Sequence, residues 1–211
     1  MNEEDYRSLI ETDYNIVYIS TELSQNIEKR LYEENKNVIK MNDSEKEINN
    51  QKFEQEFLDY LFAKLTELKL IYKKEDVLNF HTAMKTSNLV ILSGMSGTGK
   101  SKLVKAYTEA LKIKGSFKFI PVSPSWTDDT DIIGYADTLN MIYRPDDHGL
   151  VDTLIAASEK ENGNKLYIIC FDEMNLARIE HYFSQFLSIL ESDGDNRKLT
   201  LYNKELGGQI I

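Results

Sequence analysis

The chain has one cysteine, three prolines and one tryptophan among its 211 residues. A lone cysteine excludes an internal disulfide, and Cys170 lies in an apolar run, so we interpret it as a buried, inert thiol in a reducing compartment. No window reaches the roughly 18 apolar residues that cross a membrane. The acidic N-terminus, MNEEDYRSLIE, does not resemble a secretion signal. These absences predict a soluble cytoplasmic protein without membrane contact.

Basic side chains are also in short supply, with 25 Lys and Arg against 35 Asp and Glu and a formal net charge of −10. A field of this sign repels nucleic acid, so DNA contact would require a local basic patch or another protein. No Lys and Arg cluster forms such a patch in the sequence, and no direct nucleic-acid binding is evident. The three histidines lack the spacing of metal ligands, which favours structural or solvent-facing roles for His81, His148 and His181.

A phosphate-binding motif is the most informative feature that the chain does contain. GMSGTGKS at residues 94–101 matches G-x-x-x-x-G-K-[ST] and directly follows an apolar run at 89–92. Its glycines permit the backbone torsions that turn several N–H groups toward one phosphate. We expect Lys100 to reach the terminal phosphates and Ser101 to hold Mg²⁺. The predicted nucleotide contacts are Gly94, Met95, Ser96, Gly97, Thr98, Gly99, Lys100 and Ser101.

A second motif follows a continuous apolar run, in LYIICFDEMN at residues 166–175. Such a run is typical of a strand covered on both faces of a parallel sheet, and ligands bind at the carboxyl edge of such sheets. Asp172 at that edge is expected to hold Mg²⁺ beside Ser101. Glu173 is suited to polarise the water that attacks the terminal phosphate. Acid pairs at strand ends are also common as solvated turn residues or helix caps.

Strand and helix patterns alternate from residue 75 onward, which predicts an α/β fold with a parallel sheet and βαβ connections. Residues 1–74 are expected to form a helical segment with a solvated linker at 41–51, and residues 75–211 a partial NTPase core. The predicted strands are 89–93, 117–122 and 166–171. The predicted helices are 53–70, 75–84, one from the phosphate loop to about residue 112, 150–160 and 176–190. Turn residues indicate hairpins over 141–149 and in the tail, 198–211.

Together the two motifs resemble the Walker A and Walker B pair of AAA+ ATPases. WTDDTDIIGY at 126–135 resembles the D-[LI]-[LI]-G segment of the clade that contains the MoxR-type and McrB-type NTPases, and residues 172–191 resemble the Walker B helix of McrB-related proteins. The resemblance covers roughly residues 75–211. It implies a restriction-system motor that uses Mg²⁺ with ATP or GTP, assembles into a ring and activates a McrC-like nuclease partner.

The resemblance also implies three further elements: a sensor on a fourth strand, an arginine finger and a helical lid. No segment after the Walker B helix matches any of them. If the AAA+ strand order 5-1-4-3-2 applies, the fourth strand lies between the strands at 89–93 and 166–171. Its absence would leave two facing edges unpaired in the middle of the sheet. We therefore expect a truncated AAA+ domain. The alternative is a non-hydrolysing nucleotide-binding module that docks a partner through its helical N-terminus.

Six further residues have two interpretations each. The Asp146-Asp147-His148 run is compatible with a catalytic role, although a surface turn is the commoner structure for such residues. Trp126 fits a packed aromatic at a helix start better than a nucleotide stacker. Arg144 and Arg178 are candidates for contact with a neighbouring subunit, and an ordinary surface role is the alternative. Neither motif distinguishes adenine from guanine, so the choice between ATP and GTP stays open.

Overall fold

The computed structural model describes residues 13–19, 43–163, 165–191, 199 and 201. At its centre lies a four-stranded sheet in the order β2-β1-β6-β3. The strands are β1 (Asp13–Ile19), β2 (Leu89–Gly94), β3 (Phe117–Pro121) and β6 (Ile168–Asp172). β3 pairs with β6 in parallel, whereas β1 pairs antiparallel with both β2 and β6. The three strands predicted from the sequence therefore run in one direction, as the α/β pattern indicates.

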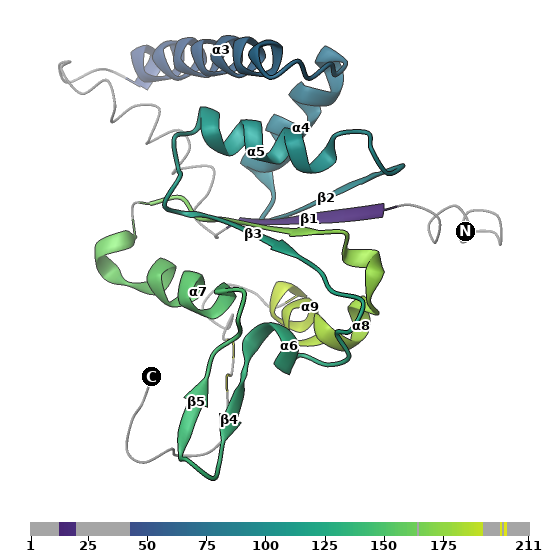
Figure 1. The fold of residues 1–211 in the computed structure, drawn as a ribbon. Coiled ribbons are helices and arrows are strands. Elements are labelled where there is room, and N and C mark those ends of the chain that lie inside the picture. The colour runs from purple at the N-terminus through teal and green to yellow at the C-terminus, as the bar shows by residue number, and fades with distance from the viewer. Residues whose placement is uncertain (1–12, 20–42, 164, 192–198, 200, 202–211) are drawn as a thin grey trace.

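The gap predicted between the strands at 89–93 and 166–171 is filled. β1 lies in that position (Figure 1), and it comes from the N-terminal region in which only helix and linker were expected. The expectation of two unpaired central edges was thus wrong for this structure. Residues 13–19 read DYNIVYI, a segment rich in the β-branched and aromatic residues that favour strands. The strand that fills the gap precedes the phosphate loop in the chain, whereas the fourth strand that the resemblance implies follows Walker B.

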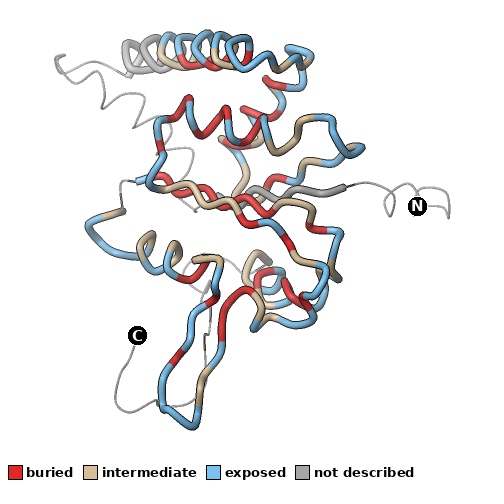
Figure 2. The backbone as a smooth tube through the Cα atoms, viewed as in Figure 1, coloured by how far each residue is buried: buried red, intermediate tan, exposed pale blue. Residues whose placement is uncertain are grey.

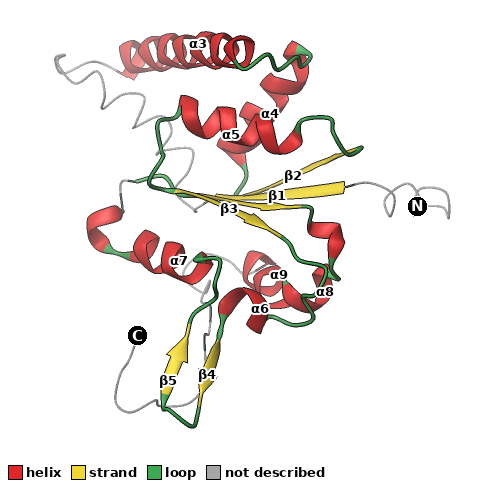
Figure 3. Ribbon diagram, in the orientation of Figure 1, coloured by secondary structure: helices red, strands yellow, loops and turns green. Residues whose placement is uncertain are grey.

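One face of the sheet is covered by α4 (Lys74–Thr86) and α5 (Lys100–Ala110), and α3 (Asp43–Glu67) lies outside them (Figures 1 and 3). The apolar stripe predicted for 53–70 is buried in a core shared with α4 and α5, at Phe57, Leu58, Leu61 and Leu65. The prediction of a linker at 41–51 was wrong from Asp43 onward, because α3 begins at that residue. Glu, Lys and Gln are good helix formers, and neither Gly nor Pro interrupts that stretch. The domain division after residue 74 stays a prediction.

The other face carries short helices: α6 (Thr130–Ile133), α7 (Leu150–Ser158), η1 (Lys160–Asn162), η2 (Met174–Leu176), α8 (Ile179–Tyr182) and α9 (Ser184–Glu191). The single helix predicted over 176–190 begins only at Ile179, because Ala177 adopts an extended conformation with φ −126° and ψ 166°. It is divided into α8 and α9 at Phe183, whose φ of −108° and ψ of 8° leave the helical region. The Tyr182 hydroxyl donates to the carbonyl of Met174 at 3.0 Å and holds the divided segment together. The predicted apolar positions are nevertheless buried at Tyr182, Phe183 and Phe186.

β6 alternates between the two cores, as expected for a strand covered on both faces. Ile168 and Cys170 belong to the core under α5, and Ile169 and Phe171 belong to the core under the short helices. Figure 2 shows the buried residues concentrated along the sheet and the inward helix faces. Burial raises the pKa of the Cys170 thiol to about 12, so the thiol is protonated and unreactive at neutral pH.

The hairpin predicted over 141–149 is shifted toward the N-terminus. Its strands are β4 (Tyr135–Asp137) and β5 (Ile142–Arg144), which pair antiparallel and project from the body of the protein (Figure 1). The Asp137 carboxylate accepts the backbone N–H groups of Leu139 and Asn140 and so fixes the turn. Contacts from Asn140 and Arg144 lower the pKa of Asp137 to about 2. The hairpin predicted at 198–211 lies outside the described residues, apart from Leu199 and Leu201.

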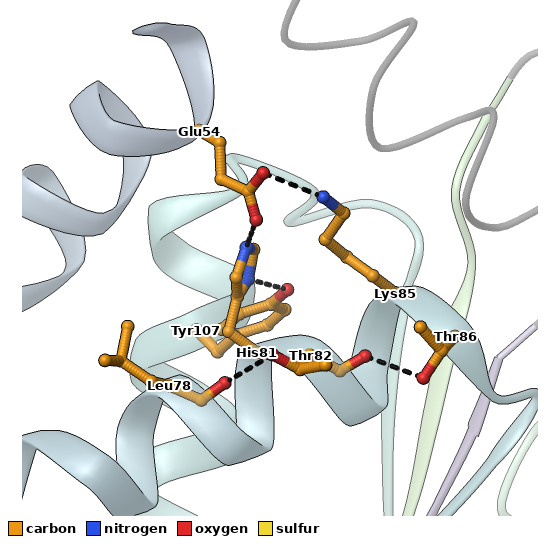
Figure 4. Close-up of polar contacts among 7 residues, drawn as sticks. All are labelled: Glu54, Leu78, His81, Thr82, Lys85, Thr86 and Tyr107. Carbon is orange, nitrogen blue, oxygen red and sulfur yellow. Dashed lines mark hydrogen bonds and ion pairs between the residues drawn. The ribbon is translucent and has the colours of Figure 1, made fainter. Parts of the chain in front are cut away.

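A buried polar network joins the three helices of the first face (Figure 4). His81 of α4, with 2% of its side chain exposed, contacts the Tyr107 hydroxyl of α5 at 2.9 Å through Nδ1. Its Nε2 contacts Glu54 of α3 at 3.1 Å, and the other Glu54 oxygen binds Lys85 at 3.0 Å. A carboxylate only accepts, so Nε2 carries the proton and Nδ1 accepts from Tyr107. Every polar group of this network therefore has a partner.

The network predicts that acid destabilises the fold. Burial lowers the pKa of His81 below its ordinary 6.5 and outweighs the charge of Glu54, so the folded protein holds His81 neutral. The unfolded chain then binds more protons, and stability is full above pH 6.5 and falls as the pH drops below it. We expect urea unfolding to give a lower stability at pH 5 than at pH 7, and His81→Gln to reduce that difference.

The carboxylate of Glu54 titrates at a lower pH than His81 and does not explain the same loss of stability. Burial acts to raise the pKa of Glu54, but the hydrogen bond and charge of Lys85, followed by His81, outweigh it and lower the pKa below 4.5. Its contribution is therefore lost at a lower pH than that of His81. A His81→Gln variant with the same loss between pH 7 and pH 5 as the unaltered protein would contradict the prediction.

Candidate functional site

The phosphate-binding motif forms the turn between β2 and α5, at the carboxyl edge of the sheet. β2 ends at Gly94 and α5 begins at Lys100, with Gly99 at the N-cap position. Gly97 and Gly99 have φ angles of 78° and 92°, in the left-handed region that side chains beyond glycine rarely adopt. The Thr98 hydroxyl donates to the carbonyl of Met95 at 2.8 Å and closes the turn. The glycines of the motif are thus required by the backbone itself.

Lys100 places a cation at the mouth of this loop. Its ammonium donates to the carbonyl oxygens of Gly94 at 2.8 Å and Met95 at 3.1 Å. The positive end of the α5 helix lies at the same place, because Lys100 is the first residue of that helix. An ammonium and a helix N-terminus together favour an anion at this edge.

The structure brings the two sequence motifs together. The Ser101 hydroxyl donates to Oδ1 of Asp172 at 2.6 Å, although the two residues belong to α5 and to the end of β6. Hydroxyl and carboxylate oxygens are the ligands that Mg²⁺ prefers. The donor set predicted from the sequence is therefore present on one edge of the sheet, and it fits the ion. Of the residues that the structure describes, no group of three or more His, Cys, Asp or Glu is placed to bind a metal.

Glu173 and the loop border one cavity of about 500 Å³. Glu173 directly follows Asp172 and has a left-handed backbone with φ 56°, which turns the chain away from the strand direction. The lining carries four lysines and a single acid, in a chain whose net charge is −10. A cavity of this charge favours an anionic ligand. Its lining residues are Lys69, Leu70, Ile71, Tyr72, Gly97, Thr98, Gly99, Lys100, Ser101, Lys102, Lys105 and Glu173.

Tyr72 is a site residue that the sequence analysis missed. It lies in the segment between α3 and α4, and its hydroxyl donates to the carbonyl of Gly99 at 2.9 Å. A Cβ on Gly99 would lie 2.6 Å from the same hydroxyl oxygen. The sequence carried no signal for this contact, because all of α4 and β2 separate the two residues in the chain.

Substitution of Gly99 by alanine is expected to distort the loop and weaken phosphate binding. The added Cβ would displace the Tyr72 hydroxyl, and the left-handed φ costs a non-glycine residue about 1–2 kcal/mol. Tyr72→Phe alone should cost about 0.5–1.5 kcal/mol, the usual contribution of one hydrogen bond. Chemical denaturation and nucleotide titration measure both effects.

A double-mutant cycle separates the contact from the backbone strain. Gly99→Ala should cost less in a Tyr72→Ala background, since the clash is then absent and only the strained φ remains. Equal costs of Gly99→Ala in the two backgrounds would show that Tyr72 does not constrain the loop.

Two of the remaining candidate residues, Asp146 and Trp126, make contacts that support the fold. The Asp146 carboxylate accepts the backbone N–H groups of His148, Leu150 and Val151, and so caps α7. Trp126 is buried, with ring centroids 5.1 Å from His148 and 5.2 Å from Tyr182. A cavity of about 810 Å³ beside the hairpin is lined by several of these residues, and it shares none with the phosphate loop. Arg144 forms an ion pair with Asp137 at 3.0 Å, and Arg178 is exposed before α8.

Comparison with known proteins adds one finding. The family described as AAA domain (dynein-related subfamily) matches residues 89–205, more than half of the chain. The matched range contains the phosphate loop, β6 and the acid pair. Neither the curated proteins nor the solved structures gave a match. Among the described helices, none is both long and apolar enough to traverse a membrane.

Proposed function

Since this chain belongs to the AAA domain family, in its dynein-related subfamily, we propose that it binds a nucleoside triphosphate with Mg²⁺ and hydrolyses the terminal phosphate. One observation carries the proposal: the phosphate loop and the acid pair meet at one edge of the sheet, with Ser101 and Asp172 2.6 Å apart. Two motifs with different predicted tasks converge there on a cavity rich in lysine.

Binding of the phosphates falls to the loop and to Lys100. The loop amides and the N-terminus of α5 offer donors and a positive potential, and the Lys100 ammonium exchanges its contacts with the loop carbonyls for phosphate oxygens. Ser101 and Asp172 would hold Mg²⁺, which when bound offsets the charge of the phosphates. Backbone donors and point charges held in place before the reaction stabilise charge without reorganisation.

Hydrolysis requires a group that orients water, and we assign this task to Glu173. It borders the same cavity as Lys100 and Ser101. Its carboxylate accepts a hydrogen bond from a water molecule and takes up the proton as the water attacks the terminal phosphorus, whose bond to the bridging oxygen breaks to release the nucleoside diphosphate. Asp172 is committed to the hydroxyl of Ser101 at 2.6 Å, so the two neighbouring acids have different tasks.

Within the family we assign the chain to the McrB-like group. Support comes from WTDDTDIIGY at residues 126–135 and from the segment 172–191, both of which resemble that group. In this proposal the nucleotide cycle drives a ring of identical subunits that activates a nuclease partner in a restriction system. ATP and GTP are both compatible with the site, because the phosphate loop does not contact the base.

Two measurements test the proposal. Titration with ATP and with GTP, each with Mg²⁺ or with EDTA, reports binding, and phosphate release reports turnover. Turnover in this chain or in a longer product of its gene supports hydrolysis. Binding without turnover in either would favour the non-hydrolysing module instead, and no binding of either nucleotide would overturn the proposal.

A further inference from the structure

β1 lies between the two strands that carry the nucleotide site. β2 leads into the phosphate loop, and β6 ends in Asp172. β1 pairs with β2 along the register from Asp13↔Gly94 to Tyr18↔Leu89, and with β6 from Ile16↔Phe171 to Ile19↔Ile168. It is antiparallel to both, while β2 and β6 run in the same direction. The strand therefore enters the sheet beside the loop, opposite Gly94.

The position of β1 fixes the separation of its neighbours. Adjacent strands lie about 4.8 Å apart, so β2 and β6 are roughly 9.6 Å apart across β1. Without β1, the two strands would either close up and pair directly or part and leave unpaired backbone groups. Direct pairing brings the two strands closer by about one strand spacing, 4.8 Å, and parting moves them further from each other. The contact between Ser101 and Asp172 measures only 2.6 Å and would not survive such a shift.

We propose that β1 is a spacer strand that sets the distance between the phosphate loop and the acid pair, and so controls the Mg²⁺-dependent part of nucleotide binding. This inference rests on the proposed function. β1 also contacts η2, the segment that follows the acid pair, so its N-terminal end adjoins both halves of the site. An N-terminal segment thereby acts as a positioning element for a reaction whose ligands come from elsewhere in the chain.

A spacer role for β1 predicts a different binding result from a role that only stabilises the fold. The phosphate loop is local to β2 and α5, and its internal contacts come from residues 94–100. It therefore retains metal-independent affinity for phosphates when β1 is displaced. The paired ligands Ser101 and Asp172 come from different elements and are lost together. Displacement of β1 should thus abolish the gain in affinity that Mg²⁺ confers and spare the affinity measured in EDTA.

The placement of β1 is tested by a register-specific cross-link. Tyr14 and Ser93 are register partners, and opposed residues of an antiparallel pair are close enough for a disulfide. Tyr14→Cys with Ser93→Cys should form an intramolecular disulfide on oxidation. Tyr14→Cys with Leu92→Cys is the control, because a shift by one residue moves the partner to the other face. Equal cross-linking of both pairs, or of neither, overturns the placement and the proposal.

The spacer role is tested by proline in the strand. Val17→Pro removes a ladder N–H from a strand that is paired on both sides. We expect its affinity for ATP with Mg²⁺ to fall at least tenfold, and its affinity in EDTA to change less than twofold. Ile10→Pro, outside β1, should bind as the unaltered protein does. Mg²⁺-dependent affinity that is unchanged in Val17→Pro, or lost equally with and without Mg²⁺, overturns the proposal.

If Val17→Pro fails to fold, the disulfide variant provides a second test of the spacer role. Oxidised Tyr14→Cys/Ser93→Cys holds β1 in place and should bind ATP with Mg²⁺ at least as tightly as its reduced form, and weaker binding on oxidation overturns the spacer role. The proposed function fails in a different way: the unaltered protein would then bind neither nucleotide, while the disulfide between residues 14 and 93 would still form.

Discussion

Replacement of Glu173 by glutamine is expected to leave nucleotide binding within about twofold and to lower the hydrolysis rate by about 10²–10⁴-fold, the usual contribution of a positioned acid or base. Glutamine keeps the size of the side chain and can still contact a water molecule, but it cannot take up the proton. Glu173 borders the cavity of the phosphate loop and is the single acid in its lining, so its loss removes the base from that lining. Phosphate release under saturating nucleotide gives the rate, and titration gives the affinity.

A matched control is available on the neighbouring helix. Glu180 of α8 is exposed and does not line the cavity, so Glu180→Gln removes the same charge from the chain without touching the site. Its hydrolysis rate should equal that of the unaltered protein. Unchanged hydrolysis in Glu173→Gln would remove Glu173 from the mechanism, while the proposed binding of nucleotide would stand on its own titrations.

Lys100→Ala should nearly abolish nucleotide binding, with at least a 100-fold loss of affinity, or about 2.7 kcal/mol. The ammonium of Lys100 lies at the loop mouth, 2.8 Å from the carbonyl oxygen of Gly94. Its removal deprives the phosphates of a charged donor and leaves two loop carbonyls without the hydrogen bonds that it donates. Isothermal titration with ATP and Mg²⁺ measures the loss, and circular dichroism shows whether the loop variant keeps its fold.

Lys114→Ala is the control for charge. Lys114 is exposed beyond the end of α5 and does not line the loop cavity, so its removal changes the net charge by the same amount. The affinity of this variant for nucleotide should stay within about twofold. Salt largely screens the interaction between the phosphates and an exposed charge that lies more than a Debye length, about 10 Å, away. Equal affinity in Lys100→Ala and Lys114→Ala would mean that the lysine of the motif does not contact the phosphates.

The chemistry-bearing residues were the most predictable part of the molecule. The phosphate motif prescribes residue types at fixed positions, and the acid pair follows a run that is apolar throughout, from Leu166 to Phe171. Carboxyl ends of parallel strands meet at one edge, so the proximity of Ser101 and Asp172 follows from the class of sheet. The direction of β2, β3 and β6 followed from the alternation of strands and helices. The sequence thus predicted both the edge and the two residues that meet there.

What escaped prediction depends on contacts between distant parts of the chain. No local pattern in DYNIVYI specifies the strands with which β1 pairs, and strand propensity depends strongly on the neighbours. Tyr72 contacts Gly99 only because α3 and α4 bring their connecting segment to the loop. The late start and the division of the helix predicted at 176–190 depend on backbone angles at Ala177 and Phe183 that periodicity does not report. The hairpin lies closer to the N-terminus than the predicted range 141–149. The carboxylate of Asp137, which precedes that range, accepts the N–H groups of Leu139 and Asn140 and fixes the turn there.

The polar network of His81 has a mechanical consequence for the loop. Tyr107 lies on the helix that begins at Lys100, and its hydroxyl is tied through His81 to Glu54 of α3. A displacement of α5 along its axis must therefore carry α3 and α4 with it or break buried hydrogen bonds, which cost about 1–3 kcal/mol each when left unsatisfied. The position of α3 and the position of the loop helix α5 are thus coupled through three side chains, Glu54, His81 and Tyr107.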